Sequence, residues 1–297
     1  MMRTAVLTAP GHFVLHAAPI PEPGPGEVRI RLEGSGVSAS SVPVWHGAPS
    51  SQYPQSSGMP GHEGWGHVDA LGDGVSGLRV GERVTAMSQR AFAEYDIARA
   101  DAVVPVPEML DHVPFPGEPF GAAFTVFAHA DVRPDDTVAI IGIGFIGAVL
   151  TRLVSSAGAR VIALSRRASS LRMAREMGAL ERVSLSKGDD ASVVARVTDL
   201  TGGRLCERVI ECVGAPETLD LAGALTAEDG RLTIAGAHAP DPAAFVQGIR
   251  AATNALAAGV LDPLPLVTHR YPLDRLDDAF RTTVARPDGF VKAVVFA

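Results

Sequence analysis

The sequence predicts an α/β fold that combines a β-rich domain with a second domain built on a doubly wound parallel sheet. Its 297 residues are about twice the length of a typical domain, so we expect two hydrophobic cores. Of the 22 prolines, only Pro134 and Pro216 lie between residues 120 and 239. Because proline removes a backbone donor and breaks helix interiors, the middle of the chain can be regular while the flanks form short strands joined by turns.

The first flank is predicted to be β structure. Several stretches are rich in β-branched residues and bounded by proline, glycine or aspartate, which is typical of short strands. They are TAVLTA (4–9), EVRIRLEGSGVS (27–38), WGHVDALG (65–72), ERVTAM (82–87) and AFAEYDIARADAVVPV (91–106). The last stretch, LVTHRYPLDRLDDAFRTTVARPDGFVKAVVF (266–296), predicts a strand, a helix and a strand, which we assign to the same domain.

The middle of the chain alternates strand and helix patterns. The apolar runs TVAII (137–141) and RVIAL (160–164) precede helical patterns at 145–157 and 168–177, and Gly178 closes the second pattern as a C-cap. The rhythm continues with RVIECVG (208–214), a helical stretch at 215–227, and RLTIAG (231–236). Such alternation predicts parallel strands with crossover helices. We therefore assign residues 120–259 to the parallel-sheet domain, and residues 1–119 and 260–297 to the β-rich domain.

The composition excludes several functional classes. Apolar residues make up 46% and charged residues 20%, as in globular proteins, and the net charge of −7 argues against a nucleic-acid surface. The apolar runs are too short to span a bilayer, and the N-terminus lacks the features of a signal peptide. Cys206 and Cys212 are too few for a disulfide framework or a four-cysteine zinc cluster. We expect a cytosolic protein that binds neither nucleic acid nor membranes.

A glycine motif indicates a nucleotide site. Gly142, Gly144 and Gly147 have the spacing G-x-G-x-x-G, directly after a predicted strand and at the start of a predicted helix that includes Phe145 and Ile146. Glycines there permit a tight turn and close approach of the backbone to a pyrophosphate, and the helix N-terminus offers free N–H groups to the anion. In the strand–turn–helix context the motif predicts dinucleotide binding.

Position 165 indicates which dinucleotide is preferred. A fold that prefers the 2′-hydroxyl cofactor places Asp or Glu at the end of the second strand to bond the ribose. Here Ser165 stands at that place and is followed by Arg166 and Arg167. No carboxylate repels a 2′-phosphate, and two guanidinium groups could bind it, so NADP(H) is favoured over NAD(H). The alternative is that the arginines form an ordinary solvated face.

Several stretches resemble the medium-chain dehydrogenase/reductase superfamily, and within it the zinc-containing alcohol and polyol dehydrogenases. They are EVRIRLEGSGVS, WHG (45–47), PGHEGWGHV (60–68), GLRVGERV (77–84), GIGFIG (142–147), ECVG (211–214) and HRYPLDRLDDAF (269–280). The resemblance implies a GroES-like catalytic domain and a Rossmann domain. It also implies hydride transfer between a nicotinamide and an alcohol/carbonyl pair, often with a catalytic zinc that polarises the oxygen.

The resemblance implies a weakened metal site. Where zinc members have a ligand cysteine after G-V, this chain has Ser38, and a neutral hydroxyl is a poor zinc ligand. The family positions of the other donors are kept by His62, by Glu63 beside it, and by Glu118 in PFPGEPFG. Zinc is therefore possible in chemical terms but uncertain. The alternative is that His62 and Glu63 belong to a turn held by hydrogen bonds and a salt bridge.

Other family positions are filled as well. By resemblance, Ser40 matches the hydroxyl that passes the substrate proton, and Trp45 and His46 match the segment at the substrate entrance, although Trp45 could equally be core. Thr125 resembles the threonine near the nicotinamide. The strand ends that flank the cofactor match Cys212, Val213 and Gly214 and, on the next strand, Ala235 and Gly236. Cys212 is interpreted as packing beside the cofactor, because no basic partner is near it in sequence.

Two family features are missing from the sequence. The chain runs from VTAM to YDIA (84–98) without the four-cysteine structural-zinc lobe. After TIAGAHAP (233–240) it enters a predicted helix at 243–258, which shortens the region near the usual dimer interface, so a homodimer is possible but altered.

Three hypotheses remain open. The first is an NADP(H)-dependent alcohol/carbonyl oxidoreductase with a degraded zinc site. The second is a zinc-free reductase of an activated alkene, imine or ketone, in which Ser40 and His62 handle the proton. The third is a nucleotide-binding protein without turnover, although retention of His62 and Glu118 argues against it. The substrate itself does not follow from these residues.

Overall fold

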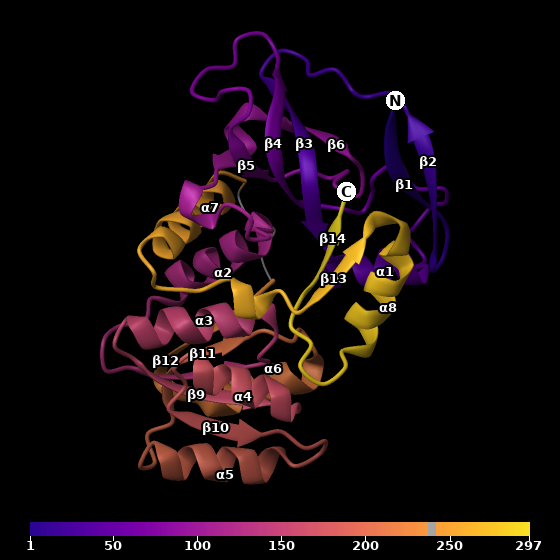
Figure 1. Cartoon of the computed structure of the whole chain (residues 1–297). Coiled ribbons are helices and arrows are strands. Elements are labelled where there is room, and N and C mark those ends of the chain that lie inside the picture. The colour runs from indigo at the N-terminus through magenta and orange to yellow at the C-terminus, as the bar shows by residue number, and fades with distance from the viewer. Residues whose placement is uncertain (237–241) are drawn as a thin grey trace. The chain divides into compact units, whose positions relative to one another are not determined.

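This computed structural model describes residues 1–236 and 242–297, in a chain that divides into two compact units. Unit 1 comprises Met1–Pro119, Ala252–Ala257 and Asp262–Ala297, and unit 2 comprises Phe120–Ala251 and Ala258–Leu261. Both contain a β-sheet and α-helices, which Figure 1 labels along the chain. Each unit is described below by itself.

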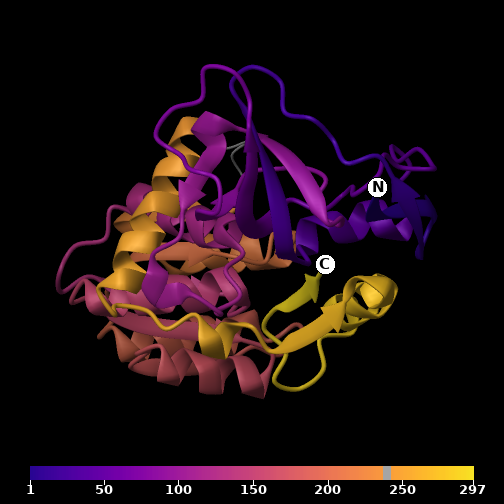
Figure 2. The same ribbon diagram turned by 45° about the horizontal axis from the view of Figure 1, so that its top comes forward.

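Unit 1 is built on a seven-stranded sheet in which β13, β14, β3, β4, β5 and β7 follow one another and β6 pairs with β3. Its strands are β3 (Glu27–Gly36), β4 (Glu63–Leu71), β5 (Arg83–Ala86), β6 (Tyr95–Arg99), β7 (Val103–Pro105), β13 (His269–Pro272) and β14 (Ala293–Phe296). Figure 2 shows the C-terminal strand beside the long β3, with which it pairs in antiparallel orientation. The C-terminal segment therefore contributes β13 and β14 to the same sheet as β3.

The alternation of β3 explains why this sheet forms a core. Val28, Ile30 and Leu32 point to the buried side, whereas Arg31 between them is exposed, as the period of two in a half-buried strand requires. Their cluster includes Val68 from β4 and other buried side chains, namely Val84, Ala86, Ala91, Ala98 and Val103. Strands β3 and β4 therefore give unit 1 a rigid base.

A second layer of unit 1 is made of a hairpin and two helices. The hairpin pairs β1 (Met2–Ala9) with β2 (His12–Ala18), and the helices are α1 (Val42–His46) and α8 (Leu276–Ala285). Aromatic side chains join them, since Phe280 of α8 stacks on Trp45 of α1 at a centroid distance of 5.4 Å. Phe13 of β2 packs at 5.5 Å from the same Phe280. This second core includes Val37 and Trp45 and therefore holds the segment between them, which contains Ser38 and Ser40.

Unit 2 has a five-stranded parallel sheet in the order β10-β9-β8-β11-β12. Its strands are β8 (Thr137–Ile141), β9 (Arg160–Ser165), β10 (Glu181–Ser184), β11 (Cys206–Glu211) and β12 (Thr226–Ile234). Between them run α3 (Phe145–Ser156), α4 (Ala168–Glu176), α5 (Asp190–Leu200) and α6 (Pro216–Leu225) (Figure 1). Helices α3 and α4 contact each other, as do α5 and α6, which matches the two faces of a doubly wound sheet. The predicted parallel α/β middle is confirmed.

Two further helices occur along the chain. Helix α2 (Gly117–Ala130) begins in unit 1 and continues into unit 2, and α7 spans Pro242–Ala257. Among the residues described here, no helix is both long and apolar enough to cross a membrane.

Several elements differ from those that the sequence predicts. Strand β2 is missed because four of its seven residues are exposed, so it lacks a clear apolar run. Strand β10 is only four residues long, and neither it nor α5 was expected. The stretch at 91–106 is not one strand, because a 3₁₀ turn at Ala100–Ala102 separates β6 from β7. The region after Ile234, which the sequence predicts to be shortened, lies partly outside the described residues, and these resume at Pro242 with α7.

Candidate functional site

The glycine motif of unit 2 forms the expected strand–turn–helix. Gly142 follows β8 with a φ of +92°, which favours glycine, and Gly144 is the N-cap residue of α3. A side chain at Gly147 would lie 2.1 Å from the carbonyl oxygen of Gly142, so the helix packs directly against the turn. A methyl group at Gly144 would meet no atom of the described residues within 4 Å. The loop is therefore open at the place where a pyrophosphate would approach the helix N-terminus.

Buried Glu211 orders the neighbouring strand end, and the sequence analysis did not single it out. Its carboxylate accepts hydrogen bonds from the N–H groups of Val213 (2.7 Å) and Gly214 (3.0 Å) and from the hydroxyl of Thr218 (2.8 Å). A carboxylate that is 0% exposed needs such donors. Its position directly before Cys212 in ECVG is the sequence feature that could have identified it.

The residues expected to flank the cofactor gather at one edge of the sheet. The N–H of Cys212 donates to the carbonyl oxygen of Ile141 at the end of β8 (2.8 Å). The N–H of Ala235 donates to the backbone carbonyl oxygen of Glu211 (2.8 Å). Val213 is 44% exposed, and its side chain would touch a Cβ at Gly142. Gly236 follows Ala235 with a φ of +94°. The strand ends thus present an apolar side chain and glycine backbone next to the motif.

Cys212 has no features of a nucleophile. Burial raises the pKa of its thiol, and the neighbouring carboxylate of Glu211 raises it further. A thiol that stays protonated is a poor nucleophile, which agrees with a packing role.

Ser165 and the two arginines lie at the same edge. The N–H of Gly142 donates to Leu164, the last residue before Ser165 (2.9 Å), so β9 ends beside the glycine turn. Ser165 is buried, and its hydroxyl accepts a hydrogen bond from the N–H of Arg167 (3.3 Å). Arg166 is exposed and Arg167 is partly buried at the N-cap of α4.

Three further residues of unit 2 were predicted to lie near the cofactor. Ile146 is partly buried in the first turn of α3, and Phe145 is buried against Phe120 at a centroid distance of 4.9 Å. Thr125 lies in α2, where its hydroxyl donates to the carbonyl of Gly121 (2.9 Å).

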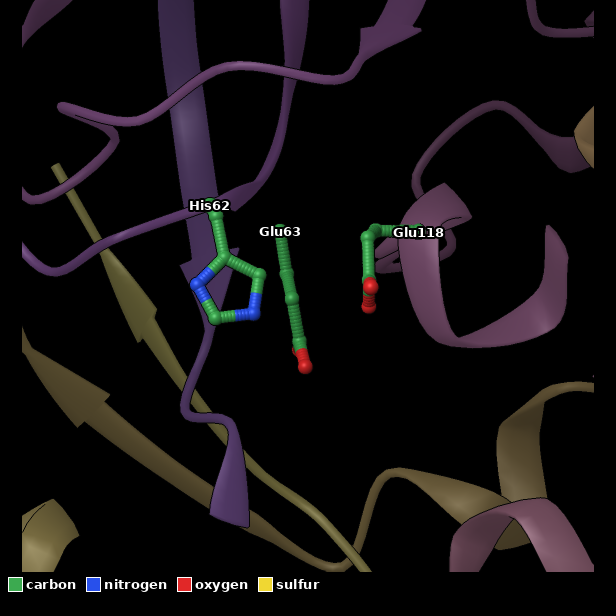
Figure 3. Close-up of side chains that lie close together, drawn as sticks. All are labelled: His62, Glu63 and Glu118. Atoms are coloured by element: carbon green, nitrogen blue, oxygen red, sulfur yellow. The ribbon is translucent and has the colours of Figure 1, made fainter. Parts of the chain in front are cut away.

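Unit 1 brings together the three predicted metal ligands. One ligand atom from each of His62, Glu63 and Glu118 lies within 4.8 Å of the others, and Figure 3 shows the three side chains extending side by side. His62 immediately precedes β4, Glu63 is the first residue of that strand, and Glu118 lies in the first turn of α2. Residues that are far apart in the sequence therefore form one group.

The hydrogen bonds of His62 fix its tautomer. Nδ1 lies 3.1 Å from the carbonyl oxygen of Pro60, which can only accept, so Nδ1 carries the proton in the neutral ring. Nε2 then has a free lone pair and lies 3.4 Å from the hydroxyl of Ser40. Ser40 is 2.9 Å from the hydroxyl of Ser38, the residue at the family's cysteine position. The three side chains form a chain of hydroxyls that ends on an imidazole.

Lys292 contacts the candidate site directly, although no sequence pattern points to it. Its ammonium lies 2.6 Å from Oε1 and 2.5 Å from Oε2 of Glu63, and the two side chains are only 7% and 1% exposed. A Cβ at Gly36 would lie 1.8 Å from Oε2, so the carboxylate rests directly on this glycine. Nothing in the tail stretch VKAVVF marked the lysine, because its partner is 229 residues away.

Glu118 has a strongly shifted pKa. Burial raises the pKa of its carboxyl to about 8, the negative charge of Glu63 adds to the rise, and Lys292 opposes it. At neutral pH the carboxyl is therefore largely protonated, and a bound cation must displace that proton.

The two residues predicted to lie at the substrate entrance, Trp45 and His46, have different surroundings. Trp45 is 5% exposed, stacks on Phe280, and donates its indole N–H to Asp277 (3.1 Å). These contacts favour the core alternative for Trp45. His46 is exposed at the end of α1 and stays a candidate.

The donor set fits a divalent cation only in part. His62 offers Nε2 with the correct tautomer, as metal-binding histidines require, and Glu118 offers a carboxylate once it loses its proton. Glu63 is already neutralised by Lys292, and Ser38 supplies no thiolate. A set of one nitrogen and one or two oxygens is weaker than the three strong ligands of a catalytic zinc site.

Two family models match the chain. Residues 24–108 match the alcohol dehydrogenase GroES-like domain, and residues 146–256 match the zinc-binding dehydrogenase family. An alcohol dehydrogenase of Cupriavidus necator is 26% identical over 99% of this chain and 98% of the relative. Sorbitol dehydrogenase of Mus musculus is 27% identical over 93% of this chain and 91% of the relative.

Solved structures agree with these matches. A zinc-dependent alcohol dehydrogenase of Streptococcus pneumonia in its apo form has a TM-score of 0.88 at 20% identity, covering 100% of this chain and 98% of that one. A protein of Sinorhizobium meliloti assigned as a zinc-binding dehydrogenase and bound to NADP has a TM-score of 0.82 at 25% identity, covering 100% and 99%. Because both halves of the chain match parts of one dehydrogenase architecture, the protein belongs to the zinc-type medium-chain dehydrogenase/reductase superfamily and is an NAD(P)-dependent oxidoreductase.

Proposed function

We propose that the protein is an NADP(H)-dependent oxidoreductase that transfers hydride between the nicotinamide and an alcohol/carbonyl substrate, with His62 and Ser40 handling the proton. The observation that carries this proposal is the fixed tautomer of His62, whose Nε2 faces the hydroxyl of Ser40. Unit 2 would hold the cofactor, and unit 1 would supply the proton-handling groups.

The preference for NADP(H) is supported by the end of β9. Ser165 places no carboxylate where a 2′-phosphate would lie, and Arg166 follows as an exposed cation. Guanidinium groups bind phosphate through charge-assisted hydrogen bonds.

The proton step follows from the hydroxyl chain. During carbonyl reduction the developing alkoxide takes a proton, which Ser40 can donate while it is replenished from protonated His62. In alcohol oxidation the same groups work in reverse, with Nε2 accepting the proton through Ser40. Ser38 orients Ser40 by the 2.9 Å contact between their hydroxyls.

A metal, if the protein uses one, would be held by His62 and Glu118, with Glu63 joining only when Lys292 releases it. Nε2 of His62 would then be a ligand and no longer a proton acceptor, so Ser40 alone would pass the substrate proton. When bound there, the cation would supply Lewis-acid polarisation of the substrate oxygen. The chain's own contribution is to hold the Nε2 lone pair ready and to keep Glu118 close to it.

The second candidate is a metal-free reductase of an activated alkene, imine or ketone. The ion pair between Glu63 and Lys292 favours it, because Lys292 already balances the charge of a carboxylate that a metal would need. The alcohol and sorbitol dehydrogenases among the relatives favour alcohols and polyols instead. In both candidates the substrate is a small molecule.

The test is elemental metal content per chain on protein purified without chelator or a metal-affinity tag, followed by NADPH oxidation with a panel of substrates. Near-stoichiometric zinc with turnover of aldehydes, ketones or polyols supports the first candidate. Absence of metal with turnover of activated alkenes or imines supports the second. Absence of hydride transfer from NADPH to any member of the panel contradicts the proposal.

Three earlier expectations stay predictions. They are the domain boundaries 1–119 with 260–297 and 120–259, the cytosolic location, and a homodimer altered by the short region after residue 239.

A further inference from the structure

Thr85 connects the two segments that hold the carboxylates of the candidate site. It lies in β5 and is 0% exposed. Its hydroxyl donates to the carbonyl of Gly64 (2.8 Å) and accepts the N–H of Gly117 (3.1 Å). Gly64 directly follows Glu63, and Gly117 directly precedes Glu118. One side-chain oxygen therefore spans from the start of β4 to the start of α2.

The contact at Gly117 is close as well as polar. A Cβ there would lie 2.4 Å from Cγ2 and 2.6 Å from Oγ1 of Thr85, so the glycine backbone rests directly on the threonine. Real Cβ atoms do not approach other atoms so closely, and any larger residue at 117 would displace the start of α2.

The strand side of this bridge is rigid, whereas the helix side depends on side-chain ties. Gly64 pairs with β3, and Trp65 pairs with Thr85 itself in the sheet ladder. The chain before Gly117 is held by Arg83, two residues before Thr85, whose guanidinium donates to the carbonyls of Leu110 (2.6 Å) and Val113 (2.8 Å). Strand β5 thus anchors the approach to α2 through Arg83 and Thr85, which lie on the face opposite to Val84 and Ala86.

We propose that Thr85 is a positioning residue whose hydroxyl sets the distance of the Glu118 carboxylate from His62 and Glu63. The inference rests on the proposed function for its consequence, because the reaction or a bound cation needs the three groups close together. Its physical content is independent of that function. Without the hydroxyl, the buried N–H of Gly117 loses its partner, so the start of α2 shifts to find another one.

The experiment compares Thr85→Val, Thr85→Ser and wild type by crystal structures and by titration with cobalt(II). Valine keeps the shape and removes the hydroxyl, whereas serine keeps the hydroxyl and removes the methyl group. We expect Glu118 to move out of the 4.8 Å group in Thr85→Val only, with cobalt affinity falling about tenfold or more. Thr85→Ser should retain both the geometry and the affinity, although it creates a small cavity and lowers thermal stability.

Thr4→Val is the matched control, because Thr4 is also a buried threonine of a strand in unit 1 and its hydroxyl has no hydrogen-bond partner among residues 1–236 and 242–297. It should change neither the geometry of the group nor cobalt affinity. Should Thr85→Val not fold, Gly117→Ala perturbs the same contact from the other side and is expected to displace Glu118 in the same way.

The inference is overturned if the first variant that folds keeps Glu118 within the group. It is also overturned if serine and valine displace Glu118 equally, since the methyl group and hydroxyl would then matter alike. A wild-type protein that turns over no substrate would contradict the proposed function only, because the crystallographic comparison does not depend on turnover.

Discussion

The glycine loop of unit 2 and the histidine–carboxylate group of unit 1 are built in opposite ways. The loop uses the backbone of six consecutive residues, Gly142 to Gly147, so its shape follows from local sequence. The group uses side chains from Ser38 to Lys292, which only the sheet of unit 1 brings together. A backbone site is therefore visible as a motif, whereas the chemistry of a side-chain site can be changed by one distant residue.

Removing His62 should have the largest effect. We expect His62→Ala to lower kcat/KM of carbonyl reduction by about 100-fold or more, the usual contribution of a general acid or base. The dissociation constant of NADPH should stay unchanged, because the glycine loop belongs to unit 2. Steady-state kinetics and a fluorescence titration measure the two quantities.

The control for this variant is His16→Ala, since His16 is exposed on β2 and contacts only the hydroxyl of Ser57 among the hydrogen bonds seen for its ring (3.2 Å). An unaffected rate in His62→Ala would mean that GHEGWG is a turn without a catalytic role.

Lys292→Met tests whether the side-chain group depends on its distant residue. Breaking one half of a buried ion pair costs about 3–5 kcal/mol, because the charge of Glu63 stays buried without its partner. We expect the free energy of unfolding, measured in urea, to fall by that amount. Added zinc should recover part of the loss, since Glu63 becomes available to a cation.

Lys187→Met removes an exposed lysine and should leave stability unchanged. If Lys292→Met were as stable as wild type and bound zinc no better, the ion pair could not be what limits metal binding.

The third prediction concerns the pKa of Glu118. The value of about 8 in the folded protein lies above the ordinary 4.5, so the folded state holds a proton that the unfolded state loses. Stability should therefore fall as pH rises from about 4.5 to 8, by up to a few kcal/mol. Glu118→Gln should remove this decline and become more stable than wild type towards pH 8. Urea unfolding at several pH values measures it.

Glu108→Gln serves as the comparison, because Glu108 is an exposed acid of the same unit. Parallel pH profiles for wild type and Glu118→Gln would show that Glu118 titrates normally.

The parts of the molecule that follow local patterns could be predicted from the sequence. The alternation around TVAII and RVIAL fixes the parallel sheet, because each short apolar run must be buried on both faces. His62, Glu63 and Glu118 could be selected only through resemblance, yet the structure does place them together.

What could not be predicted depends on tertiary contacts. Lys292 acts through Glu63, and Thr85 acts through two glycines, so neither residue has a local signal. Trp45 matched a family position, but its burial against Phe280 depends on where α8 packs. Strand register and helix packing determine which of these side chains contact each other, and neither can be derived from a single sequence.

Gly144→Ala tests the backbone site with little risk to the fold. In the part of the chain that the structure describes, a methyl group at this position meets no atom within 4 Å, and the φ of −92° is allowed for alanine. It would occupy the space through which a pyrophosphate reaches the helix N-terminus, so we expect NADPH affinity to fall by about tenfold to 100-fold with unchanged stability. Isothermal titration and thermal unfolding measure the two effects.

Gly223→Ala, in helix α6, is the matched control, because a Cβ there also meets nothing within 4 Å. It should leave NADPH affinity unchanged and raise stability slightly. Full NADPH affinity in Gly144→Ala would mean that the cofactor does not lie on this turn.

The smallest expected effect is on NADPH binding when Arg166 and Arg167, beside the glycine loop, are removed. Arg166→Ala combined with Arg167→Ala should weaken NADPH binding by about tenfold and leave NADH binding nearly unchanged, because only the 2′-phosphate loses charge-assisted hydrogen bonds. Arg166 is exposed, so screening by water keeps the effect modest, and it should shrink further in high salt. Equal losses for both cofactors would assign the arginines to the fold. The loop would then bind a dinucleotide through its backbone alone, without a side chain that selects which one.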